Sequence, residues 1–140
     1  MMQLIDTNLL IYAFDADSGA KHATACKLMH EIFSGELPAA ISNQTLAEFY
    51  SVATRANRPP LSKEQALNCI LDLINCSRLT KLDYDCSTIP RAATLSKNTG
   101  AHFWDALLAQ TALDNGIRFI ITEDDHFRKI PGLKVVNPFK

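Results

Sequence analysis

Several features that mark special classes of protein are missing from this chain of 140 residues. Neither charge is in excess, because 14 Lys and Arg residues face 15 Asp and Glu residues and the formal net charge is −1. The whole-protein charge therefore gives no long-range attraction for a nucleic acid. Scattered cations could still form a local basic rim, although ordinary solvated surface is the simpler interpretation of Lys21, Arg55, Arg58, Arg91 and Lys97.

Targeting and membrane-spanning segments are also missing from the sequence. No charged leader followed by an apolar stretch opens it, and no apolar run approaches the roughly 20 residues that cross a bilayer. We therefore expect a cytoplasmic protein with no membrane partner. Internal repeats, low-complexity tracts and Gly/Ser linkers are absent too, so residues 1–140 are expected to form one domain.

The four cysteines have none of the spacings that bind zinc or build a disulfide framework. No CxxC pair occurs, and no cysteine has a histidine at zinc-finger distance. Three of the four lie in helical patterns beside apolar residues, where a free thiol behaves as a small hydrophobic group. We interpret all of them as reduced structural cysteines: Cys26, Cys69, Cys76 and Cys86.

What the sequence does contain is a regular alternation of strand-like and helix-like segments. Ser62 to Gln65 has the pattern of a capping box at the start of a helix, and Asn115-Gly116 is a typical helix end. The expected strands are 2–5, 39–41, 79–82, 118–122 and 133–136. The expected helices are 9–14, 20–33, 43–55, one from Ser62, 89–97 and 103–113. This alternation predicts a three-layer α/β fold, a central parallel sheet flanked by helices.

Acidic residues stand where such a sheet binds ligands, beyond the carboxyl ends of its strands. Asp6 ends the first expected strand and Asp124 follows the fourth, but helix capping and turn formation explain these two residues as well. Asp105 lies on the apolar face of its helix, where an ionised carboxylate needs a partner or a metal, unless the helix dipole alone accounts for it. Glu48 lies off the apolar stripe of its helix, so the pattern alone predicts a solvated side chain.

The residues around these acids resemble the PIN-domain family, and within it the VapC toxin branch, over nearly the full chain. Each matching segment is weak by itself, whereas four in this order are a specific signal. The segments are Ile5-Asp6-Thr7-Asn8, the run from Ile41 to Phe49, the run from Phe103 to Ala109, and Ile121-Thr122-Glu123-Asp124.

The resemblance implies a PIN-like nuclease domain in which four acids converge at one end of the sheet. By position these acids are Asp6, Glu48, Asp105 and Asp124, and the neighbouring Asp125 is an alternative to the last of them. Thr7, Asn8 and Thr122 match positions that hydrogen-bond the acids or the attacking water; capping and turn chemistry are their ordinary alternatives. The resemblance further implies a VapB-like antitoxin as partner, an RNA substrate and a homodimer.

Clustered carboxylates repel one another until a cation binds, and hard divalent ions prefer oxygen ligands. The resulting hypothesis is a ribonuclease dependent on Mg²⁺ or Mn²⁺, with all four acids as catalytic metal ligands and Asp6 and Asp105 foremost. A haloacid-dehalogenase phosphatase is disfavoured, because Asn8 replaces the second aspartate of that motif. The remaining alternative is an inactive PIN fold that binds protein or RNA. His102 and His126 are interpreted as surface or capping residues.

Overall fold

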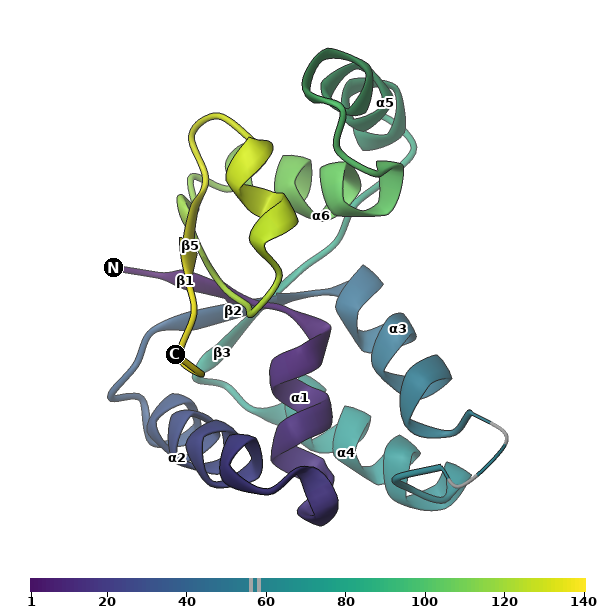
Figure 1. The fold of residues 1–140 in the computed structure, drawn as a ribbon, viewed down its shortest axis with the longest axis vertical. Coiled ribbons are helices and arrows are strands. Elements are labelled where there is room, and N and C mark those ends of the chain that lie inside the picture. The colour runs from purple at the N-terminus through teal and green to yellow at the C-terminus, as the bar shows by residue number, and fades with distance from the viewer. Residues whose placement is uncertain (56, 58) are drawn as a thin grey trace.

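Five short strands form one parallel sheet in the described part of the chain (Figure 1). The computed structural model describes residues 1–55, 57 and 59–140. The spatial order is β3-β2-β1-β4-β5, and each neighbouring pair is parallel. β2 and β3 lie on one side of β1, and β4 and β5 lie on the other. The direction in which strands are added therefore reverses between β1 and β4, which is the topological switch point of the sheet. The strands are β1 (Gln3–Ile5), β2 (Ala39–Ser42), β3 (Leu79–Leu82), β4 (Phe119–Ile121) and β5 (Lys134–Val136).

Helices cover both faces of this sheet. In Figure 1, α1 to α4 lie on one side and α5, α6 and the second 3-10 helix lie on the other. The α-helices are α1 (Thr7–Phe14), α2 (Ala20–Ser34), α3 (Asn43–Ala53), α4 (Lys63–Asn75), α5 (Thr88–Thr99) and α6 (Phe103–Asp114); the 3-10 helices are η1 (Ala16–Ser18) and η2 (Asp125–Lys129). The predicted three-layer α/β fold is confirmed.

The sheet divides the core in two because successive strand side chains point to opposite faces. Ile5 and Ile121 pack into the cluster under α1 to α4, whereas their neighbours Leu4 and Ile120 pack into the cluster under α6 and η2. All four side chains are 0–2% exposed. The central strands are therefore anchored from both faces, which fixes the positions of the residues that follow them.

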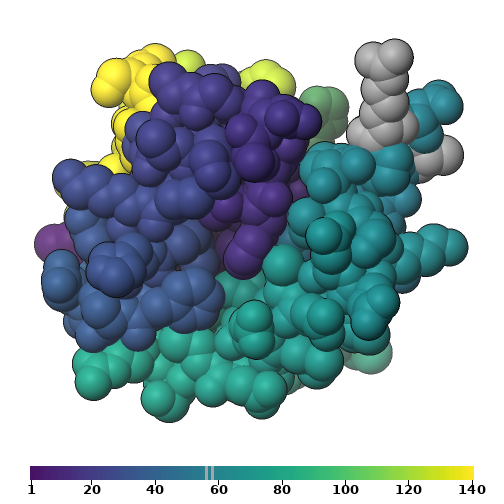
Figure 2. Space-filling model, turned by 90° about the horizontal axis from the view of Figure 1, so that it is seen from below, coloured from purple at the N-terminus to yellow at the C-terminus, as the bar shows by residue number. Residues whose placement is uncertain are grey.

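The end of the chain returns to the N-terminal helices. Figure 2 shows from below that α1 and α2, in purple and blue, lie beside the teal helices, with the yellow C-terminal residues next to α2. The ring of Phe139 packs edge-on against Tyr12, with 5.1 Å between centroids. The Lys21 Nζ lies 6.0 Å from the Phe139 ring centroid. The C-terminus thus lies near the first turn of α2.

The predicted strands and helices are present, with differences at their ends. The capping box is confirmed: the Ser62 hydroxyl accepts from the Gln65 amide at 3.1 Å, and the Gln65 side chain accepts from the Ser62 amide at 2.9 Å. α3 ends at Ala53, before the predicted end at Arg55. The four cysteines are free thiols. Among the described residues, no helix is long and apolar enough to cross a membrane.

Candidate metal-binding carboxylate site

Asp6 follows β1 directly, and its side chain is both a helix cap and part of the site. The Asp6 Oδ1 accepts a hydrogen bond from the Thr7 amide at 2.8 Å, which makes Asp6 the N-cap of α1. The residue is only 8% exposed, and this burial raises the pKa of Asp6 to about 6. Charges on Glu48 and Asp105 raise that pKa further, while hydrogen bonds from Thr122 and Thr7 oppose the shift. Capping and site membership are therefore compatible.

A hydroxyl at the end of β4 connects the residues that follow the two central strands. The Thr122 Oγ1 donates to the second carboxylate oxygen of Asp6 at 2.8 Å. The Thr122 Oγ1 in turn accepts from the Asn8 Nδ2 at 2.9 Å and from the Asp124 amide at 3.0 Å. Thr122 is fully buried, so these bonds are shielded from water. Asn8 and Thr122 thus contact the acids, as their match to the family pattern implies.

Glu48 is partly buried and hydrogen-bonded, so the prediction of a solvated side chain is wrong. Its Oε2 accepts from the Thr7 hydroxyl at 2.9 Å, and its Oε1 accepts from the Gln44 Nε2 at 3.0 Å. α3 packs against α1 as well as β2, so two of its sides are covered. The helical pattern identifies only the apolar stripe of α3. It does not show that a polar side of α3 faces α1.

Asp105 and Asp124 form the other side of the site together with a histidine. One ligand atom each from Asp105, Asp124 and His126 lies within 4.8 Å of the others, close enough for one metal ion. Partial burial and the charge of Asp124 raise the pKa of Asp105, while His102 and His126 lower it. The sequence gives His126 an ordinary surface role, but its ring lies beside these acids. Two signals point to it in the sequence: its position two residues after Asp124 and the metal-ligand chemistry of imidazole.

All four acids line a single pocket of about 370 Å³. Asp125, the alternative fourth acid, is not among the lining residues. Its carboxylate instead lies 2.9 Å from the Arg128 Nε and 3.8 Å from the Lys140 Nζ, and these cations lower the pKa of Asp125. Asp124 caps η2 through the His126 amide while it lines the pocket. The pocket is lined by Asp6, Thr7, Asn8, Ile11, Tyr12, Glu48, Val52, Asp105 and Asp124.

One cation at the pocket rim is already paired. The Lys21 Nζ lies 2.8 Å from the Glu123 Oε2, and Glu123 also accepts a short hydrogen bond from the Tyr12 hydroxyl. Tyr12 lines the pocket, so this trio borders it. Of the other rim candidates, Arg91 pairs with an aspartate of α6, and Arg58 lies outside the described residues. Two of the five cations that the sequence offers for a basic rim, Lys21 and Arg91, are therefore already paired with acids.

Comparison with known proteins identifies the family. The family described as the PIN domain matches residues 4–133, nearly the whole chain. The chain belongs to the PIN domain family. No curated protein matches it by sequence. Solved structures of low identity share the fold of this PIN domain.

In each of these similarities, nearly all of this chain aligns with nearly all of the matched chain. One is from the VapBC2 structure of Rickettsia felis bound to a promoter DNA fragment, with 24% identity, 98% coverage of each chain and a TM-score of 0.67. VapC20 of Mycobacterium tuberculosis, described as a toxin that cleaves the sarcin-ricin loop, has 17% identity, coverage of 91% and 93%, and a TM-score of 0.70. DNA-bound VapBC of Salmonella typhimurium has 21% identity, 99% coverage of each chain and a TM-score of 0.70.

The donors of this PIN domain fit a hard divalent cation. Four carboxylates supply oxygen ligands, which Mg²⁺ and Mn²⁺ prefer. The Asn8 Oδ1 is buried without a hydrogen-bond donor among the described residues, at the edge of the same pocket. An acceptor in this state is suited to a water molecule held by a cation, because Mg²⁺ retains several of its waters. Burial, together with the charges of neighbouring acids, raises the pKa values of Asp6 and Asp105, and a bound cation would oppose both effects.

Proposed function

We propose that this PIN domain is a metal-dependent endoribonuclease of the VapC toxin type, acting on RNA phosphodiester bonds. The observation that carries the proposal is the meeting of four carboxylates, from four separate segments of the chain, in one pocket at the switch point of the sheet. The fold it shares with VapC20 and the VapBC structures supports the same reading.

In this proposal Asp6 and Asp105 are the main ligands of Mg²⁺ or Mn²⁺, and Glu48 and Asp124 complete the site directly or through water. A divalent ion held by these carboxylates would supply Lewis-acid chemistry: it would make a water molecule more acidic and offset charge on the leaving oxygen. With Asp6 at a pKa of about 6, most of its population is ionised at pH 7.5 even in the absence of metal. The carboxylate is therefore available to a cation near neutral pH.

The neighbouring polar side chains hold these acids in place. Thr122 and Asn8 both donate to the Asp6 Oδ2 and the Thr7 amide donates to the Asp6 Oδ1. The Thr7 hydroxyl and the Gln44 amide each donate to one oxygen of Glu48. Glu48 also lines the pocket, so in this proposal its carboxylate accepts a proton of the attacking water. Preorganised donors of this kind need no rearrangement as the reaction proceeds, and this lowers the barrier.

The proposal includes the partners that the VapC type implies. Structures of similar fold are described as VapBC assemblies, one of them from Salmonella typhimurium bound to DNA. A VapB-like antitoxin whose segment covers the carboxylate pocket is therefore proposed, together with a homodimer of this chain. Exposed apolar side chains on α2 and α4 offer surface for such contacts: Phe33, Leu67, Leu71 and Ile74.

The test is cleavage of end-labelled RNA by the purified chain with Mg²⁺ or Mn²⁺, with and without EDTA. Cleavage should require the metal. Asp6→Asn should reduce the rate by on the order of a thousandfold with the fold retained by circular dichroism. Asp72→Asn, an exposed acid of α4, is the matched control and should cleave like the parent chain. Equal cleavage by Asp6→Asn and the parent chain contradicts the proposal. RNA binding without metal-dependent cleavage supports the inactive binding module instead.

A further inference from the structure

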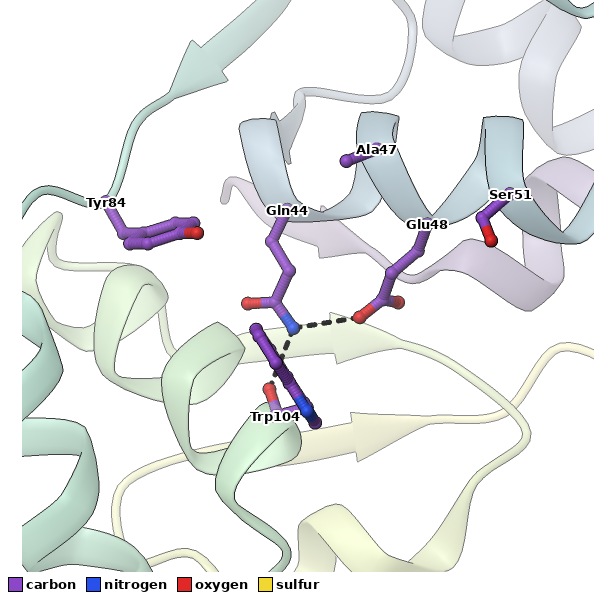
Figure 3. A pocket seen from close by; sticks show the side chains of 6 residues that line it. All are labelled: Gln44, Ala47, Glu48, Ser51, Tyr84 and Trp104. Carbon is purple, nitrogen blue, oxygen red and sulfur yellow. Dashed lines mark hydrogen bonds between the residues drawn. The ribbon is translucent and has the colours of Figure 1, made fainter.

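A second cavity adjoins the carboxylate pocket on the opposite side of Glu48. It encloses about 430 Å³, and Glu48 lines both spaces. Figure 3 shows the cavity between α3, the chain after β3 and the start of α6. Its lining is more apolar than that of the carboxylate pocket and contains a single acid. The lining residues are Gln44, Ala47, Glu48, Ser51, Tyr84 and Trp104.

Two aromatic rings border this cavity. Trp104 is 59% exposed, unusual for the largest apolar side chain, and Tyr84 is half-buried. The Phe103 ring packs edge-on against Trp104 with 5.3 Å between centroids, and the backbone amide of Tyr84 donates to the Asn43 Oδ1 at 3.2 Å, which holds the backbone that carries the Tyr84 ring. Partly exposed aromatic rings at a cavity are groups on which flat ligands stack.

The most deeply buried polar residue that lines the cavity is Gln44, which is only 6% exposed. Its Nε2 donates to the Glu48 Oε1 at 3.0 Å and to the Trp104 carbonyl at 2.9 Å. Both partners are acceptors, so the amide orientation is fixed and the NH₂ group cannot point the other way. The Gln44 Oε1 is consequently left buried with no donor among the described residues. In Figure 3 this oxygen points away from Glu48, toward the side of Tyr84.

We propose that this cavity is a nucleotide subsite, which takes an unpaired RNA base next to the phosphate in the carboxylate pocket. The base stacks on Trp104 and Tyr84, and one of its N–H groups donates to the Gln44 Oε1. The inference rests on the proposed nuclease function, since it places the base beside the scissile phosphate. The Gln44 Oε1 is covered in the free chain. Binding of the base therefore requires that one of the side chains lining the cavity moves to expose this oxygen.

The chemistry of the cavity favours a base over an apolar peptide side chain. A buried acceptor without a donor is unfavourable, and an apolar occupant would leave it so, whereas a base offers an N–H and two flat faces together. The N–H groups on the Watson–Crick edge of a base are occupied in a duplex. The subsite therefore selects single-stranded RNA, and stacking contributes affinity that does not depend on the net charge of the chain, which is −1.

The position of Trp104 gives a direct test, because it is the single tryptophan of the chain. The full chain in EDTA is titrated with tetranucleotides of adenosine, of purine riboside, which lacks the amino group, and of abasic ribose phosphate. Binding is followed by tryptophan fluorescence and by anisotropy of labelled RNA. The adenosine probe should quench the fluorescence and the abasic probe should not. The purine probe should quench it with affinity weaker by about tenfold, because it leaves the Gln44 acceptor unpaired.

Variants separate stacking from general effects. Tyr84→Ala should weaken adenosine binding by on the order of tenfold. Ile89→Ala removes an exposed side chain of α5 outside both cavities and should leave binding unchanged. No binding, equal quenching by the abasic probe, or quenching by an apolar peptide but not by RNA would each overturn the subsite. If base-dependent quenching occurs without cleavage, the nuclease proposal fails instead. If cleavage occurs without base-dependent quenching, only the subsite fails.

Discussion

The two halves of the carboxylate pocket are built in different ways. In the inner half, Asp6 and Glu48 accept hydrogen bonds from side chains on α1, α3 and the end of β4. In the outer half, burial and charge shift the pKa of Asp105, and Asp124 lies beside it with His126. The inner half is thus held by the fold before any ligand arrives. In the outer half, one ligand atom each from Asp105, Asp124 and His126 lies within 4.8 Å of the others, an arrangement that a single cation could bridge.

The largest expected effect tests which acid completes the outer half. Asp124→Asn should reduce RNA cleavage by on the order of a thousandfold, because it removes a carboxylate that lines the pocket. Asp125→Asn should change it by no more than about twofold, because its exposed pair with Arg128 is worth little. Initial rates at saturating Mn²⁺ are the measurement. The reverse order of the two variants would falsify the assignment of Asp124.

The second effect tests the inner half through pH. The pKa of Asp6 is about 6 in the folded chain and near its ordinary 3.8 when unfolded. Well below pH 4 the group is protonated in both states and has no effect. Between about pH 4 and pH 6 the unfolded chain releases this proton while the folded chain still holds it, so the free energy of unfolding falls by about 3 kcal/mol at most and levels off above pH 6, where both states are ionised.

This loss is measured as the difference between the parent chain and Asp6→Asn in urea unfolding without metal, from about pH 4 to pH 7.5. The Asp6→Asn variant should not show the part of the fall in unfolding free energy that comes from Asp6, since its amide does not titrate. Mn²⁺ should restore stability to the parent chain at pH 7.5 and less so at pH 5. A parent chain that gains stability relative to the variant as pH rises would contradict the raised pKa of Asp6.

A smaller effect should come from the hydroxyl that connects β1 and β4. Thr122→Val preserves the side-chain shape but removes the donor to Asp6 and the acceptor used by Asn8 and Asp124. We expect a loss of about 1–3 kcal/mol in unfolding free energy and a further rise in the pKa of Asp6. Thr122→Ser, which keeps the hydroxyl, is the control. Equal stabilities of the Val and Ser variants would show that the hydroxyl network is unimportant.

The smallest effect concerns metal preference in the outer half. Imidazole nitrogen suits Mn²⁺ better than Mg²⁺, which strongly prefers oxygen. His126→Ala should therefore weaken activation by Mn²⁺ by about three- to tenfold and change activation by Mg²⁺ less. His30→Ala, an exposed histidine of α2, is the control. Identical changes with both metals would place His126 outside the coordination of the ion.

The sequence predicts the fold and the acids at the strand ends better than it predicts their surroundings. Asp6 and Asp124 follow strands with clear apolar patterns, so the parallel sheet alone places them together. Glu48 could be placed only by resemblance to the family, because a wheel with one apolar stripe cannot show that α1 covers a second side of α3. Gln44 lies within a segment that resembles the family, but the pattern gives it no role, and Tyr84 lies outside the matching segments. Their contacts depend on how α3, α6 and the loop after β3 meet, which is a matter of tertiary packing.

The strand order also governs when the pocket can exist during synthesis. Asp6 is made almost first, yet the backbone of β1 pairs with β4, whose residues are made more than a hundred positions later. A nascent chain that has reached the end of α6 already contains Asp6, Glu48 and Asp105 but has neither β4 nor Thr122 to bring them into register. The catalytic pocket of a protein proposed to cut RNA therefore stays incomplete until β4 and the residues after it have been synthesised.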